Sequence, residues 1–570
     1  MTELLIVMVV ALVVIAGATL VGPRFGVASP LVLVGIGVAA SLLPAFDSVQ
    51  IDPELILLGI LPPLLYSAAV SLPTMNFRRE FGAISGLSVA LVVGTSLILG
   101  VFFMLVIPGL GFAWGVALGA IISPTDAVAA SIIKQTPVSK RVVAMLDGES
   151  LLNDATALAL LRSAIVATAA SFSFWGVVGA FTYSALIALV IGGAVGWLNL
   201  AVRKRITDPT VNTAISFVVP FVAAVPAELL GASGLVAAVV AGLVTGIRAA
   251  RVLSPQNRLS DSQNWRMIEL VLEGAIFLMM GLQISAILTD VENDHAGIRV
   301  AVLIAVGALV ITVLVRAVYV ASLLGFLSRH ARRQAKLKPR IEAIQERLRA
   351  PGDPANSSVP MRGFRSTTPE RHRRRVAGLV TRSLADIEYF LREPLGWREG
   401  TTVVWAGMRG AITVAAAQTL PADTPLRSTL VLIAFTVAAL SLLVQGGTIG
   451  ALVRRISPNV DRAAQDERAT AERARLFDLL AASARSVPKR AVDTDDASET
   501  DHGEVDDDYA APRGWSDADK QHRLAVIGAQ RTALLDARDN GIFDADLLEN
   551  ALDNLDATQI TLEMRGKPVG

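Results

Sequence analysis

Long apolar runs fill most of the first 455 residues of this chain and leave few folds open to it. One helical crossing of a bilayer core takes about 20 apolar residues. About thirteen such segments can be placed, which predicts an all-α polytopic membrane protein. They lie near residues 3–22, 27–44, 53–71, 81–107, 112–135, 141–170, 174–201, 210–227, 229–247, 267–288, 298–327, 399–420 and 426–453. The composition agrees, since 53% of the 570 residues are hydrophobic and 18% are charged.

The basic residues between these runs predict which loops face the cytoplasm, where Lys and Arg are enriched. Every second loop is basic, whereas the others, such as the turn that begins at Pro421, carry few positive charges. The basic positions are Arg24, Arg78, Arg79, Lys134, Lys140, Arg141, Arg203, Lys204, Arg205, Arg248, Arg251 and Arg258. We therefore expect a protein of the plasma (bacterial inner) membrane, with its N-terminus outside and its C-terminus cytoplasmic. This orientation depends on a split between Pro226 and Gly231, which divides one apolar region into two helices.

The chain divides into a transmembrane domain, residues 1–455, and a cytoplasmic tail, residues 456–570. A basic cytoplasmic insertion, residues 328–398, is expected near the anionic inner leaflet, either as a solvated topogenic loop or as a lipid-recognising segment. The tail contains an acidic low-complexity linker, 494–508, and the pattern of a helical hairpin, 516–565. We expect the tail to be a dimerisation or regulatory appendage, because it lacks a set of nucleophile, base and orienting group.

The cysteine count and the net charge exclude several kinds of function. The chain has no cysteine, which excludes disulfides and thiolate metal sites. Its net charge of +1 gives no field directed at nucleic acid, so we expect no nucleic-acid partner. We expect no cofactor either.

Ionisable side chains within the apolar runs point to function, because each costs several kcal/mol in a bilayer unless it is paired or hydrated. In the segment 112–135, Pro124 and Asp126 stand in the middle of apolar sequence. Proline removes a backbone donor and clashes with the preceding turn. We expect the helix to unwind near Ser123 to Asp126, which exposes carbonyls and the Thr125 hydroxyl. A simple proline kink, with Asp126 capping the second half-helix, is compatible with this prediction.

The next segment contains the GESLLND stretch, Gly148–Asp154. Glu149 and Asn153 are four residues apart, as are Ser150 and Asp154, so each pair shares a face of the helix. Two carboxylates and an amide there predict a site for a small cation or a proton. Capping of the cytoplasmic helix end is the weaker explanation, because Asp154 lies about 20 Å along the helix from Arg141.

Two arginines also lie inside apolar runs. Arg316 is too far from either end of its segment to reach water easily and needs a buried anion, for which Glu149 and Asp126 are the candidates. Arg409 stands between Gly407 and Gly410, which permit unwinding or close backbone approach. It is expected to shape an inward gate or to neutralise the C-terminal end of a half-helix.

Other intramembrane charges are weaker signals. Arg162 lies eight residues beyond Asp154 and is expected to have a partner on the outward side. Glu228 and Glu269 lie near helix ends, where their carboxylates can reach water. Glu273 lies deeper, either as a structural residue or along the translocation path.

These residues resemble the monovalent cation:proton antiporter family, which includes the bacterial NhaP and the animal NHE exchangers. The similarity covers about residues 5–455 and is carried by four stretches. They are LPPLLY at Leu61–Tyr66, SPTDAV at Ser123–Val128, GESLLND at Gly148–Asp154 and GMRG at Gly407–Gly410. The chain departs from the family pattern at Ser67, where many relatives carry an acidic residue.

The resemblance implies a role for each of these residues. Asp154 would bind the transported Na+ or the proton, beside Asn153, with Ser150 as a further ligand. Thr125 and Asp126 would belong to the region where two broken helices cross, and Glu149 would pair with Arg316. The family resemblance also implies two inverted repeats, a homodimer and a core domain that moves.

We therefore predict a secondary active transporter, not an enzyme, that exchanges Na+ for protons by competition at Asp154 and serves pH and sodium homeostasis. Li+ and K+ are further candidate cations. Because Asn153 rather than a second acid stands beside Asp154, we expect electroneutral exchange. The alternatives are a proton-coupled transporter of another solute, such as an organic anion bound by Arg316 or Arg409, and a membrane sensor that signals through the tail.

Overall fold

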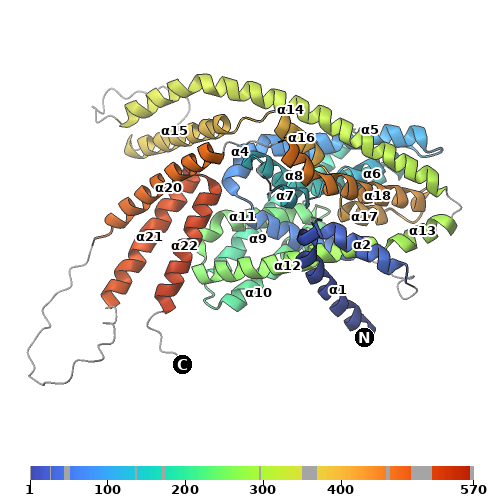
Figure 1. The fold of residues 1–570 in the computed structure, drawn as a ribbon, viewed down its shortest axis with the longest axis horizontal. Coiled ribbons are helices and arrows are strands. Elements are labelled where there is room, and N and C mark those ends of the chain that lie inside the picture. Colours follow the sequence, from blue (N-terminus) through green and yellow to red (C-terminus); the bar gives the residue numbers. More distant parts are fainter. Residues whose placement is uncertain are drawn as a thin grey trace, which may run out of the picture. The chain divides into compact units, whose positions relative to one another are not determined.

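The computed structural model describes residues 2–25, 27–43, 52–126, 128–134, 136, 138–169, 174–293, 297–349, 369–456, 462–488 and 517–564. Within these ranges every regular element is a helix, which confirms the all-helical prediction (Figure 1). The chain forms two compact units, each described by itself below. Unit 1 comprises Met1–Lys336 and Tyr389–Val460, and unit 2 comprises Leu337–Glu388 and Asp461–Gly570.

The helices follow one another along the chain without an intervening strand in the described ranges. In order they are α1 Thr2–Val21, η1 Gly22–Phe25, α2 Ser29–Ser41, η3 Leu55–Ile60, α3 Leu61–Ser71, α4 Thr74–Ser85, η4 Gly86–Leu91, α5 Val92–Val106, α6 Phe112–Ile122, α7 Val128–Lys134, α8 Lys140–Ala169, α9 Phe174–Arg203, α10 Pro209–Leu229, α11 Gly234–Val252, α12 Pro255–Leu282, α13 Ile284–Asn293, α14 Ile298–Arg349, α15 Pro369–Arg392, α16 Trp397–Trp405, α17 Ala411–Gln418, α18 Arg427–Ser441, η6 Leu442–Gly446, α19 Gly447–Ile456, α20 Arg462–Arg485, α21 Asp517–Asn540 and α22 Ala545–Met564. The elements η3, η4 and η6 are π-helical and continue directly into α-helices.

By length and composition, eight helices of the described chain can cross a membrane. They are Thr74–Val106, Lys140–Thr168, Gly179–Arg203, Pro209–Leu229, Gly234–Val252, Pro255–Glu292, Ile298–Glu346 and Arg427–Ile456. Four shorter apolar helices add to these: Leu5–Val21, Ser29–Ser41, Leu55–Ser71 and Phe112–Ile122. The expected split is present, because α10 ends at Leu229 and Gly231 adopts a φ of 71° before α11 begins. The total of about thirteen crossings stays a prediction.

Two of the expected segments are interrupted in the middle. The first is divided into α6 and α7, with Pro124 in the interval that the sequence analysis expects to unwind. The second is divided into α16 and α17 around the GMRG stretch. Proline removes a helical hydrogen bond and glycine weakens a helix, so each break lies where the backbone is poorly suited to remain helical.

The helices of unit 1 pack mainly in two sets. In one set, α6 packs against α5, α8, α17 and α18, α4 packs against α8, and α7 against α19. In the other, α11 packs against α3, α9 and α10, and α12 packs against α1, α2 and α10. Small residues allow the closest approaches, since a side chain at Gly119 would collide with the backbone of Ser96. The interrupted helices thus belong to the first set.

Two membrane helices extend further than the sequence pattern predicts. The helix α12 begins at Pro255 instead of near residue 267, with the Ser254 hydroxyl accepting a hydrogen bond from the backbone N–H of Asn257 at 3.3 Å. A serine cap followed by proline is a strong helix start, and it outweighs the polar composition of the first turns. The helix α14 continues beyond the apolar run to Arg349 although it contains Pro339.

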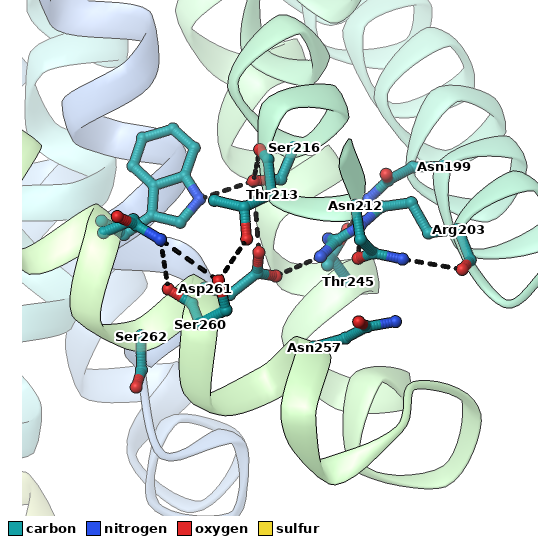
Figure 2. A network of polar contacts seen from close by, with 12 residues as sticks. Asn199, Arg203, Asn212, Thr213, Ser216, Thr245, Asn257, Ser260, Asp261 and Ser262 are labelled. Carbon is teal, nitrogen blue, oxygen red and sulfur yellow. Dashed lines mark hydrogen bonds and ion pairs between the residues drawn. The ribbon is translucent and has the colours of Figure 1, made fainter. Parts of the chain in front are cut away.

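A polar network links the C-terminal end of α9 to the N-terminal parts of α10 and α12 (Figure 2). Arg203, expected in a loop, is instead the last residue of α9 and is only 1% exposed. Its guanidinium donates to the Asn212 side chain at 2.8 Å and forms an ion pair with Asp261. The Trp265 indole N–H donates to the Ser216 hydroxyl at 3.0 Å. These bonds satisfy a buried charge and fix the three helices in one arrangement.

Unit 2 contains the helices of the tail. The predicted hairpin corresponds to α21 and α22, and α20 packs against α21 as a third helix. Arg531 of α21 pairs with Asp556 of α22 at 2.7 Å, and the backbone N–H of Asp544 donates to Glu472 of α20 at 2.8 Å. The acidic linker 494–508 and part of the insertion, 350–368, lie outside the described residues.

Replacing Asp261 with Ala should remove the countercharge of a buried arginine, at a cost of about 3 kcal/mol. We expect thermal unfolding of the purified protein in detergent to begin several degrees lower. The double variant Arg203→Met with Asp261→Leu should recover most of this loss, because no buried charge then remains unpaired. The exposed Asp290 of α13 supplies the control, and an equal loss in Asp290→Ala would contradict the prediction.

Candidate cation site

The two interrupted helices meet at their breaks. The backbone N–H of Asp126, between α6 and α7, donates to the carbonyl of Met408, between α16 and α17, at 2.8 Å. One carboxylate oxygen of Asp126 accepts the backbone N–H of Val128 at 3.0 Å and so caps α7. The capping geometry considered for Asp126 is therefore present together with the unwound backbone. Each break supplies a partner for the other, as unwound backbone at membrane depth requires.

Arg409 lies at the C-terminal end of α6. Its guanidinium donates to the carbonyl of Ile122 at 3.0 Å and to that of Ser123 at 3.4 Å, and it also bonds the carbonyl of Gly407. Carbonyls at a helix end lack partners within the helix and carry the negative end of the helix dipole. This position corresponds to the second of the two functions expected for Arg409, in which its charge neutralises a half-helix.

Glu149 of α8 and Arg316 of α14 form a buried ion pair. Arg316 Nη2 donates to Glu149 Oε2 at 2.7 Å, and Nη1 bonds the other carboxylate oxygen. Arg316 Nε donates to the carbonyl of Val403 at 2.9 Å. The Thr125 hydroxyl donates to Glu149 Oε1 at 3.1 Å. Of the two anions considered for Arg316, the structure therefore pairs it with Glu149 and leaves Asp126 free of it.

Asn153 connects α8 to the first break. Its side-chain N–H group donates to the Thr125 hydroxyl at 2.7 Å and to the Thr125 carbonyl at 3.1 Å. This orientation leaves the Asn153 Oδ1 atom, which is buried, without a hydrogen-bond partner in the described chain. Because Thr125 also binds Glu149, one hydroxyl joins the ion pair to the amide.

Asp154 is a carboxylate of the site that no arginine of the described chain neutralises. Its side chain is 2% exposed, and its Oδ1 atom is buried without a hydrogen-bond partner in the part of the chain that the structure describes. Its carboxylate also interacts with that of Asp126, so the two repel each other when both are ionised. An ionised carboxylate buried in this way is costly unless a positive partner joins it. A carboxylate oxygen of this kind suits either a small hard cation or a proton, and the unpartnered amide oxygen of Asn153 is a further candidate ligand.

The other predicted residues take different positions. The Ser150 hydroxyl donates to the backbone carbonyl of Asp147 at 3.2 Å, so it is engaged on its own helix and not with Asn153 or Asp154. A side chain at Gly407 would meet the Arg316 guanidinium, and one at Gly410 would overlap the Asp126 carboxylate. These glycines admit the two charged groups beside the second break.

The sequence analysis missed a polar pair next to Arg409. The Ser441 hydroxyl accepts the backbone N–H of Arg409 at 2.9 Å and donates to the Gln445 side chain at 2.5 Å. Both residues are buried, and Gln445 belongs to the π-helical element η6. The available signal was a glutamine followed by Gly446 and Gly447 inside an apolar run.

Together, the fold and the site define a class of protein. Interrupted membrane helices whose breaks meet at buried charged groups are typical of secondary transporters. A sodium/hydrogen exchanger transmembrane family model matches residues 7–344 and 373–455. The chain belongs to the sodium/hydrogen exchanger family.

Individual relatives agree with this assignment. An uncharacterised Na+/H+ exchanger of Mycobacterium bovis is 27% identical over 459 residues, which cover 79% of this chain and 74% of the relative. A sodium, potassium, lithium and rubidium/H+ antiporter of Bacillus subtilis is 29% identical over 305 residues, which cover 52% of this chain and 45% of the relative. The structure of the sodium proton antiporter MjNhaP1 from Methanocaldococcus jannaschii has a TM-score of 0.54 at 15% identity, covering 80% of this chain and 99% of that one. At this identity, the structural likeness supports the fold.

Replacing Gly410 with Ala should displace the Asp126 carboxylate, because the added carbon would overlap it. We expect at least a tenfold loss of cation-dependent proton movement in vesicles, since small displacements in a preorganised site cost about that much or more. Gly447→Ala is the matched control, because a side chain there would meet no atom within 4 Å. Equal activity of the two variants would show that close approach at Gly410 is unimportant.

Proposed function

We propose that this protein is a Na+/H+ antiporter in which Na+ and protons compete for Asp154. The observation that carries the proposal is the buried Asp154 carboxylate with an unpartnered oxygen, beside a Glu149 whose charge is already balanced by Arg316. Asn153 and Asp154 supply the cation-binding oxygens, with Thr125 orienting Asn153. Asp126 is a further cation-binding candidate, although it also caps α7.

Competition follows from the charges. Arg316 balances Glu149, and Arg409 faces the negative end of α6, so neither arginine is available to neutralise Asp154. An empty, ionised Asp154 is costly to move across an apolar barrier, whereas bound Na+ or a bound proton neutralises the charge of this carboxylate. The core therefore moves with one positive cargo in either direction. Since Asn153 is an amide, one proton exchanges for one cation, and transport is electroneutral.

The cation range of the proposed exchange includes Li+ and K+ as well as Na+. The Bacillus subtilis relative is named for sodium, potassium, lithium and rubidium, which supports testing all four ions. A site built from amide and carboxylate oxygens binds hard cations, and their sizes decide the preference.

The occupied arginines also weigh against transport of an organic anion. Arg316 is held by Glu149 and Val403, and Arg409 by carbonyl oxygens at the end of α6, so both would have to give up buried bonds to bind a substrate carboxylate. Such a loss leaves charged groups unpaired and is costly.

The wider setting is proposed on the sequence pattern and the family. We place the protein in the bacterial inner membrane as a homodimer, with the N-terminus outside, the C-terminus cytoplasmic and two inverted repeats within residues 1–455. The tail, 456–570, and the insertion, 328–398, are cytoplasmic appendages to the transporting domain. Exchange of this kind serves pH and sodium homeostasis.

Replacing Asp154 with Asn should abolish exchange, because an amide can be neither protonated nor charged to hold Na+ in this way. The measurement is the collapse of a pH gradient in everted membrane vesicles, followed with a pH-sensitive dye on adding chloride salts of Na+, Li+, K+ and Rb+. Asp290→Asn, an exposed position on α13, controls for the loss of a carboxylate elsewhere. Robust exchange in folded Asp154→Asn protein would refute the proposal.

Competition at one carboxylate also predicts how pH changes the kinetics. At pH values below the pKa of the site, each further unit of acidification should raise the apparent KM for Na+ about tenfold, while the maximal rate stays the same. Initial rates across a series of Na+ concentrations and pH values measure both quantities. A maximal rate that falls with acidification at constant KM would point instead to a separate regulatory proton.

A further inference from the structure

A cavity of about 430 Å³ lies between α1, α2, α7, α12 and α19. Its charged lining residues are Glu273 and Arg454, and its polar lining includes Thr19, Ser131 and Thr136. A water molecule occupies about 30 Å³, so the cavity can hold several waters around these groups. The cavity is therefore suited to hydrated ions.

The cavity lies on the cytoplasmic side of the first break. Ser131 belongs to α7, the half-helix that begins directly after the break, and Thr136 follows its end. Arg454 is in the last turn of α19, which leads to the cytoplasmic tail in the expected topology. Val27 and Ala28 line the cavity and follow Arg24, in a loop that the basic residues assign to the cytoplasm.

Glu273 is the unexplained charge of this cavity. It stands in the apolar second half of α12. Among the described residues, neither Arg454 nor any other side chain forms a hydrogen bond or an ion pair with it. Its charge interacts electrostatically with those of Asp126 and Glu269. An unpaired carboxylate in a membrane helix lowers the stability of the protein, so its presence indicates a function that needs the charge.

We propose that Glu273 is the carboxylate that draws cations from the cytoplasm into the site and binds them transiently on their way to Asp154. A negative charge in a water-filled cavity with low-dielectric walls raises the local concentration of cations. Ser131 of α7 lines the same cavity, and α7 begins directly after the break that borders the main site. The inference rests on the proposed antiport and assigns to it a second, cytoplasmic cation-binding residue.

The chain contains no cysteine, so single-cysteine variants test the position of Glu273 without a transport measurement. Glu273→Cys and Ser131→Cys should react with a membrane-impermeant thiol reagent in inside-out vesicles and not in right-side-out vesicles. Leu303→Cys, at a 71% exposed apolar position of α14, should stay unreactive in the hydrocarbon. Reaction of Glu273→Cys only from the outside, or no reaction while Ser131→Cys reacts, would overturn the proposal.

Transport then tests the charge itself. Glu273→Gln should raise the apparent KM for Na+ on the cytoplasmic side about fivefold to tenfold, with the maximal rate little changed, because Asp154 remains. Glu269→Gln is the matched control, one turn earlier on α12 and outside the cavity lining. Glu273→Asp, which keeps the charge, should keep the low KM.

Chemical modification separates charge from shape. Treating Glu273→Cys with a reagent that adds a sulfonate should lower its KM again, whereas a reagent that adds an ammonium group should not.

A KM for Glu273→Gln equal to that of the wild type would overturn the inference while leaving antiport intact. Wild-type vesicles that exchange no monovalent cation would overturn the proposed function, and the thiol labelling would still decide whether Glu273 faces the cytoplasm.

Discussion

The ion pair between Glu149 and Arg316 is the interaction on which the candidate site depends. An arginine inside a membrane protein stays charged and requires an anion, and Glu149 meets this need with both carboxylate oxygens. Thr125 binds Glu149 and also receives the amide of Asn153, so the orientation of Asn153 follows from that of the ion pair. Both oxygens of the Glu149 carboxylate are thus bonded to Arg316, whereas Asp154, five residues later on α8, has an oxygen without a partner in the described chain.

The two breaks form a second constraint, because neither can exist alone in a bilayer. The backbone of Asp126 uses a carbonyl from the second break, and the guanidinium of Arg409 uses carbonyls from the first. Unwound backbone at this depth needs such partners. Because each break supplies hydrogen-bond partners for the other, the two breaks are held together as one unit. The same contacts keep the carboxylate of Asp126 next to Gly410.

Sequence reasoning predicts those parts of the structure that have local causes. Pro124 removes a helical hydrogen bond by its own chemistry, and the spacing of Glu149, Asn153 and Asp154 on one helix follows from the geometry of that helix. Arg316 pairs with Glu149 and not with Asp126 because of how the helices pack in the tertiary structure. The sequence alone could not distinguish between these two candidate partners. Ser150 shows the same limit of sequence reasoning. Its four-residue spacing from Asp154 predicted a shared helical face, but its hydroxyl donates to a backbone carbonyl of its own helix. The π-helical elements depend on how the neighbouring helices pack. The contact between Ser441 and Gln445 depends on packing too, although a glutamine before two glycines in an apolar run marked the position of Gln445.

The polar network of Figure 2 has a consequence for how this protein is made. Arg203 ends α9, whereas its countercharge Asp261 is synthesised 58 residues later, on α12. During insertion by the translocon, α9 therefore reaches the bilayer with an uncompensated arginine at its C-terminal end, where the headgroups can hold it. The bundle of α9, α10 and α12 closes only when the chain has been made as far as α12. The assembly of these three helices therefore depends on Asp261, which is synthesised last.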